Sequence, residues 1–213
     1  PYYIFPVIAL ICNIFVVSGN CFNYIKAGNL NLKLLTPYLI GSIPLAFFGG
    51  SLQIDKNLFE IFLFIVLTLA GTLLLINFKS YDDNESTYRN IPIFISILIG
   101  AILGFVSGVV GVGGGIFLSP ILFLFKAAKP KHIVTAASLF IFINSISGVI
   151  GQLTKDIVLS DISNYWYLFL VVIIGGHIGN YLNLKIFPTR FLALITSILV
   201  LLVAIRIGIK LFL

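Results

Sequence analysis

The residues of this chain that could do chemistry gather in the stretch GFVSGVVGVGGGIFLSP, from Gly104 to Pro120. Each of three consecutive glycines costs a helix interior about 1 kcal/mol, so this stretch favours an unwound backbone. An unwound backbone exposes amide N–H groups, and a helix that restarts after it adds the positive end of its dipole. Such a site prefers a negatively charged ligand. The candidate binding residues here are Ser107, Gly111, Gly113, Gly114 and Gly115.

Neutral hydrogen-bonding side chains in two other apolar stretches add to this candidate site. They are Asn13 and Ser18 near the N-terminus, and Asn144, Ser147 and Gln152 in INSISGVIGQL. One such residue alone often bridges two membrane helices, whereas a cluster can line a path for a solute. Both interpretations stay open at this point.

His177, in GGHIGN, lies near the middle of an apolar stretch and is a further candidate. It could carry a coupling proton or meet an anion, but a lone buried histidine more often bonds a neighbouring helix. All seven carboxylates fall in polar loops or near the ends of apolar runs, which argues against a carboxylate proton relay. Because no acid–base pair, nucleophile arrangement or metal cluster is present at depth, we expect neither an enzyme nor a cofactor.

The elements that must position these residues are predicted to be membrane-spanning helices. The chain is 60% hydrophobic and 9% charged, against about 45–50% and about 25% in soluble domains. Its basic residues are dispersed among loops, which argues against nucleic-acid binding. Most of the apolar runs approach the ~20 residues of a spanning helix, which predicts an all-α, polytopic integral membrane bundle. These runs are Tyr2–Tyr24, Leu34–Leu52, Leu58–Phe78, Ile91–Phe125, Ile133–Leu153, Tyr165–Leu184 and Phe191–Leu213.

The run from Ile91 to Phe125 is too long to be one straight spanning helix. As a single helix its ~35 residues would measure ~52 Å, against a hydrocarbon core of ~30 Å. We therefore expect a break at GVGGG, next to a cavity that covers the unwound backbone. If the segment crosses once, the loops carry seven basic residues on one side and six on the other, whereas a re-entrant hairpin gives nine against four. The hairpin obeys the positive-inside rule and is the predicted arrangement.

Other glycines are spaced by four residues, which is typical of close helix packing. We expect packing, not binding, at Gly100, Gly104, Gly108, Gly175 and Gly179. Cys12 and Cys21 both lie in the first apolar run and are expected to be free thiols.

The two halves of the chain share a pattern of polar and small residues. A shift of 129 residues places Ser18 and Gly19 over Ser147 and Gly148. We expect a first repeat over 1–78, a polar linker over 79–90 and a second repeat over 91–213, an organisation common in transporters. The sequence has no methionine and starts at Pro1, so we expect it to begin inside a longer protein, with a further glycine stretch before Pro1.

The stretch GFVSGVVGVGGGIFLSPILFLF resembles the glycine signature of the sulfite exporter TauE/SafE family, and AASLFIFINSISG and VVIIGGHIGNYLNLKIFPTRF fit later spans of that family. The resemblance implies export of small anions such as sulfite, sulfonates or organic acids across a bacterial inner membrane. The implied partners are the anion, the lipid bilayer and a coupling proton or cation. The alternatives are a membrane assembly subunit that transports nothing and, less favoured, a membrane-embedded enzyme.

Overall fold

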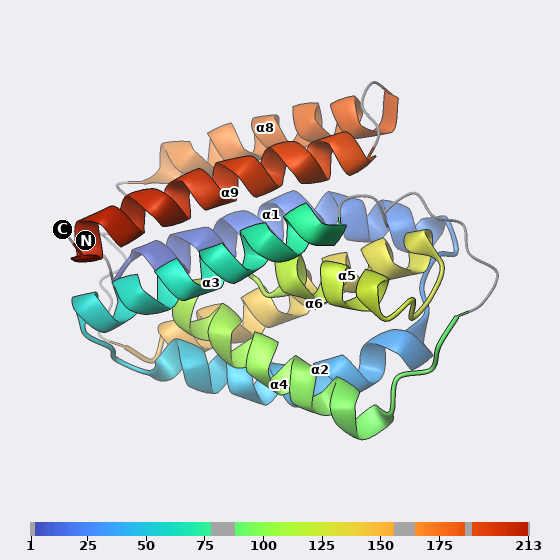
Figure 1. The fold of residues 1–213 in the computed structure, drawn as a ribbon, viewed down its shortest axis with the longest axis horizontal. Helices are drawn as coiled ribbons and strands as arrows, with labels where there is room; N and C mark the ends of the chain where they lie inside the picture. The colour runs from blue at the N-terminus through green and yellow to red at the C-terminus, as the bar shows by residue number, and fades with distance from the viewer. Residues whose placement is uncertain (1–2, 78–87, 156–164, 186–188, 213) are drawn as a thin grey trace.

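The computed structural model describes residues 3–77, 88–155, 165–185 and 189–212, and this part of the chain is built from helices (Figure 1). Six of these helices are long and apolar enough to cross a membrane. The all-α membrane fold predicted from the sequence is therefore confirmed. The helices are α1 (Phe5–Lys26), α2 (Leu32–Ser51), α3 (Lys56–Asn77), α4 (Ile93–Val110), α5 (Gly115–Leu124), α6 (Pro130–Gln152), α8 (Trp166–Lys185) and α9 (Thr189–Phe212).

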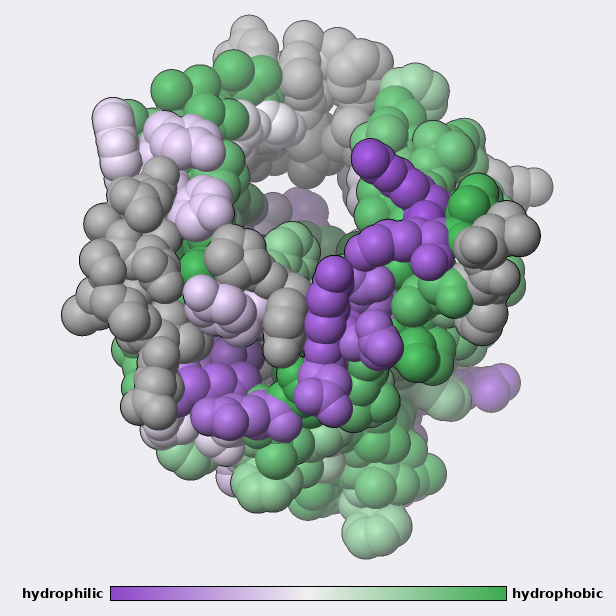
Figure 2. Space-filling view, turned by 90° about the vertical axis from the view of Figure 1, so that its left-hand side faces the viewer, coloured by the Kyte–Doolittle hydropathy of each residue, from purple (hydrophilic) through white to green (hydrophobic). Residues whose placement is uncertain are grey.

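The outward faces of the helices are strongly apolar. Phe22, Ile76 and Phe94 expose 68%, 73% and 76% of their surface. In water such continuous apolar exposure would drive association, whereas in a bilayer it faces lipid tails. Polar groups belong at the ends of such a bundle, and Figure 2, which views the end where α6 stops and α3 starts, shows a hydrophilic band crossing that face between apolar regions.

The main core lies where α2, α3, α4, α5 and α6 pack against one another. Gly100, Gly104 and Gly108 of α4 lie against the α2 backbone so closely that a Cβ atom at any of them would overlap it. The packing role predicted for these three glycines is confirmed. The same prediction is wrong for Gly175 and Gly179, because a Cβ atom on either would meet nothing within 4 Å in the described part of the chain.

The helix break predicted in GVGGG is confirmed. Helix α4 ends at Val110, and Gly111, Gly113 and Gly114 have φ values of +83°, +79° and +69°. These left-handed conformations are cheap only for glycine. Gly115 is already the first residue of α5, so the unwound segment runs from Gly111 to Gly114.

The re-entrant hairpin is also confirmed. Figure 1 shows α4 and α5 running in opposite directions. The Arg89 N–H donates a hydrogen bond of 3.0 Å to the Lys126 carbonyl, so the segment leaves and returns on the same side. On the opposite side, Lys210 forms an ion pair of 2.6 Å with Glu60 at the start of α3. Lys79 lies outside the described residues, as do the side chains of Lys185 and Arg190.

Candidate functional site

The break between α4 and α5 is enclosed by α1 and α6. Gly111, Gly113, Gly114 and Gly115 are all buried. The Asn13 side-chain amide donates to the Gly111 carbonyl at 3.3 Å, which gives a partner to a carbonyl that α4 leaves free at its end. A Cβ atom on Gly113 would lie only 2.8 Å from Asn13 Nδ2, so the close approach requires glycine.

The first turn of α5 has no capping side chain. Its N-cap is Gly114, and no side chain forms a capping hydrogen bond there. The Phe117 and Leu118 N–H groups donate to the Gly114 carbonyl at 3.1 and 3.2 Å, as in an ordinary first turn. The positive end of this ten-residue helix therefore points at the break without a capping side chain or an acidic residue in its first turn.

Ser107 lies beside this helix start. It is fully buried, and its hydroxyl has no hydrogen-bond partner among the described residues. Its Cβ lies 3.5 Å from the position that a Cβ on Gly114 would take. A buried hydroxyl without a partner costs about 1–3 kcal/mol, so this donor is available for a ligand or a water molecule.

Asn144 approaches the break from α6. Its Nδ2 donates to the Phe140 carbonyl at 2.8 Å, while its Oδ1 is buried without a partner. Residues 140, 144 and 148 share a helix face. Phe140 Cε1 lies 2.9 Å from a Cβ built on Gly114, and a Cβ built on Gly148 would lie 3.5 Å from the Gly108 Cα. Asn144 therefore faces the segment between Gly108 and Gly114 and presents an acceptor to it.

Two predicted site residues make helix-to-helix bonds. The Ser147 hydroxyl donates to the Ile43 carbonyl of α2 at 2.7 Å. Gln152 is fully buried and donates to the Gly108 carbonyl in the last turn of α4 at 2.8 Å. Its oxygen accepts a bond of 2.9 Å from Lys155 Nζ, and burial lowers the pKa of this lysine. Gln152 thus fixes the end of α4, and Ser147 fixes α6 on α2.

Ser18 lies away from the break. Its hydroxyl donates to the Phe15 carbonyl at 2.9 Å, and the residue lines a hollow of about 160 Å³ between α1 and α8. His177 lies in α8, and its side chain is outside the described part of the structure. The structure thus brings Asn13, Ser107, Asn144 and Gln152 to the break and leaves Ser18 elsewhere.

The cavity expected beside the break stays a prediction, because the two hollows described next lie elsewhere in the fold. One is the hollow beside Ser18, and the other, of about 240 Å³, lies where α2 and α4 begin. Neither is lined by the glycines of the break. The burial of Gly111, Gly113 and Gly114 shows that protein atoms cover the unwound backbone, which satisfies the requirement for shielding from lipid.

Sequence reasoning missed two buried hydroxyls on α2. Tyr38 and Ser42 are 1% and 0% exposed, and neither hydroxyl has a hydrogen-bond partner within the described residues. The backbone atoms of these two residues lie against Gly100 and Gly104 of α4. The available signal in the sequence was that Tyr38 and Ser42 are four residues apart, as are Gly100 and Gly104. Pairing the first two with the second two requires the register between α2 and α4, which the sequence does not give.

Comparisons with known proteins agree with this architecture. The family model of the sulfite exporter TauE/SafE matches residues 2–207. A probable membrane transporter protein of Sinorhizobium fredii is 27% identical over 90% of this chain and 77% of its own length. Others from Methanocaldococcus jannaschii and Bacillus subtilis are 29% and 25% identical, over 88% and 92% of this chain and 74% and 77% of their own lengths. No solved structure matches the chain significantly.

Proposed function

The chain belongs to the sulfite exporter TauE/SafE family and is a membrane transporter, and from this premise we propose that it carries a small oxyanion through the break between α4 and α5. The proposed substrates are sulfite, sulfonates or organic acids. The proposed location is a bacterial inner membrane, with the basic face on the cytoplasmic side and net movement outward.

The pair of unpartnered polar atoms at the break carries this proposal. Ser107 supplies a hydroxyl donor beside the uncapped start of α5, and Asn144 supplies an acceptor that faces the segment before it. An oxyanion needs donors and a positive field, and one that keeps a proton, such as hydrogensulfite, also offers a hydrogen to an acceptor. No formal charge is needed in the site, so the anion is held weakly enough to leave it.

The proposed movement separates the break from the helices that now hold it. Asn13 ties α1 to Gly111, and Gln152 ties α6 to Gly108. Access from the face that carries Lys155 requires these two bonds to part. In this proposal residues 1–78 and 91–213 are the two repeats that move relative to each other, driven by a coupling proton or cation.

Flux through proteoliposomes tests the proposal. Ser107→Ala removes a donor to a charged ligand, worth about 1.5–3 kcal/mol, so we expect flux at subsaturating labelled sulfite to fall at least tenfold. The stability of this variant should hold or rise, because the deleted hydroxyl has no partner. Ser147→Ala is the matched control: it should lose about 1 kcal/mol of stability with its bond to Ile43 but keep its flux.

Two outcomes would contradict the proposal. One is wild-type flux in Ser107→Ala. The other is the absence of flux for sulfite, sulfonates and organic acids in the intact wild-type protein, which would favour an assembly subunit that transports nothing.

A further inference from the structure

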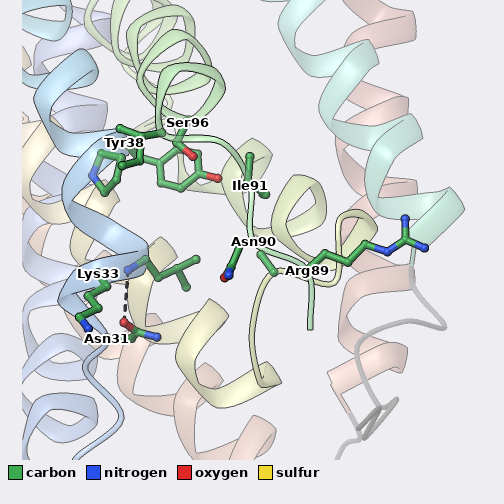
Figure 3. A pocket seen from close by; sticks show the side chains of 11 residues that line it. Asn31, Lys33, Tyr38, Arg89, Asn90, Ile91 and Ser96 are labelled. Atoms are coloured by element: carbon green, nitrogen blue, oxygen red, sulfur yellow. Dashed lines mark hydrogen bonds between the residues drawn. The ribbon is translucent and has the colours of Figure 1, made fainter. Parts of the chain in front are cut away.

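A second hollow lies at the basic face, where α2 and α4 both begin (Figure 3). It measures about 240 Å³. Ser96 and Ser107 lie eleven residues apart on α4, so the hollow is about 16 Å from the break along that helix. Its polar lining residues are Asn31, Lys33, Tyr38, Arg89, Asn90 and Ser96.

The floor of the hollow carries a buried donor. Tyr38 is 1% exposed, and its hydroxyl lies beside the Ser96 side chain without completing a hydrogen bond to a described residue. Figure 3 shows this hydroxyl directed across the hollow towards Ile91, with the Asn90 side chain pointing inward from the same wall. A phenol and an amide can both donate to an oxygen atom placed between them.

Two helix dipoles direct their positive ends at the same space. Helix α2 starts at Leu32 and helix α4 at Ile93, both at the edge of the hollow. Asn31 caps α2 by accepting from the Leu34 N–H at 3.2 Å, whereas α4 has Pro92 at its N-cap and no side-chain cap. The first amides of α4 therefore remain available to a negative ligand.

The mouth of the hollow is positively charged. Lys33 and Arg89 both contribute to the lining, and none of the described lining residues is a carboxylate. In Figure 3 their charged ends extend outward from the space, so they act on a ligand through their field and not through direct bonds.

We propose that this hollow binds a small oxyanion, such as a sulfonate, at a site separate from the break. Tyr38 and Asn90 donate to the oxyanion, the two helix starts hold its charge, and Lys33 and Arg89 attract it from solution. The same chemistry fits a free solute or the phosphate of a lipid headgroup. Binding of an oxyanion in the hollow does not depend on the proposed function. Only the idea that this oxyanion is the transported solute, bound before it enters the break, rests on the proposed function.

A cysteine reporter inside the hollow tests the proposal without any transport measurement. Ala127 lines the hollow, so Ala127→Cys is placed in a chain whose Cys12 and Cys21 are replaced by serine. The protein is held in nanodiscs of neutral phosphatidylcholine, and maleimide labelling is followed as methanesulfonate is added. We expect labelling to slow at least fivefold at saturation. Asn57→Cys, exposed at the opposite face, is the control and should label at a constant rate.

Two variants separate the direct donor from the electrostatic field. Tyr38→Phe keeps the ring and should raise the half-protecting concentration at least tenfold, at low and high salt alike. Lys33→Gln should raise the half-protecting concentration two- to fivefold at low ionic strength. In 0.5 M KCl it should leave that concentration unchanged, because the Debye length is then only about 4–5 Å and the exposed charge is screened. Tyr24→Phe, which removes a hydroxyl outside the hollow, is the control for the first variant.

The lipid arm identifies the source of the oxyanion. Protection by methanesulfonate in neutral nanodiscs supports a solute site. Slow labelling in phosphatidylglycerol nanodiscs without solute supports a headgroup in the same oxyanion site. Unchanged labelling in both arms, or equal protection in Tyr38→Phe and wild type, would overturn the proposal. Because labelling needs no flux, a failure of transport would leave this result standing.

Discussion

Gly114→Ala is the substitution that most sharply probes the break. Gly114 has φ of +69°, where an alanine costs about 1–2 kcal/mol. Its new Cβ would lie 2.9 Å from Phe140 Cε1 and 3.2 Å from the Leu103 carbonyl oxygen. Overpacking of this kind costs about 1–3 kcal/mol. The total loss of stability should therefore be about 2–5 kcal/mol.

Two other glycines separate backbone strain from damage to the site. Gly28 has φ of +71° but nothing within 4 Å of a built Cβ, so Gly28→Ala pays only the backbone cost. Gly175 also has nothing within 4 Å and lies inside α8, so Gly175→Ala should be neutral or stabilising by up to about 1 kcal/mol. Each of the three variants adds one methyl group, and they differ in whether that group meets backbone strain, close neighbours, both or neither.

Flux of labelled sulfite into proteoliposomes, at matched protein content, is the assay, with thermal unfolding in detergent as the measure of stability. We expect Gly114→Ala to lose at least tenfold in flux, because displacement of Phe140 or Ser107 deforms the binding geometry. Gly28→Ala should stay within twofold of wild type. Equal flux in Gly114→Ala and Gly28→Ala would refute the reasoning, because backbone strain alone would then explain whatever effect is seen.

Two further predictions concern topology and the end of α4. Cysteines introduced at Lys129 and Lys155 should be labelled from opposite sides of the membrane, and labelling of both from one side would contradict the hairpin. Gln152→Leu removes the partner of the buried Gly108 carbonyl and should cost about 1–3 kcal/mol in thermal or denaturant unfolding. An unchanged unfolding transition would mean that this bond does not hold α4.

The parts of the fold that depend on local chemistry could be predicted from the sequence. Consecutive glycines disfavour a helix wherever they occur, so the break at Gly113 and Gly114 follows from composition. The hairpin followed from counting basic residues in loops, because orientation in the membrane depends on that charge.

The parts that depend on register between helices could not be predicted. Gly104 and Gly175 both lie in GxxxG patterns, yet only Gly104 has a neighbouring helix against it. Ser18 and Ser147 occupy equivalent places in the proposed repeats, yet one bonds within α1 and the other reaches α2. Tyr38 is one polar residue among many in the sequence, and only the packing of α2 against α4 reveals its buried, unpartnered hydroxyl.

An experimental map of the protein with a bound electron-dense oxyanion would test the central claim most directly. Selenite is a suitable probe in a preparation that is shown to transport it. We predict density between the end of α4 and the start of α5, within hydrogen-bonding distance of the Ser107 hydroxyl and the Gly113 and Gly114 amides. A saturated, transport-competent sample whose break stays empty while selenite occupies some other place in the membrane would contradict the claim.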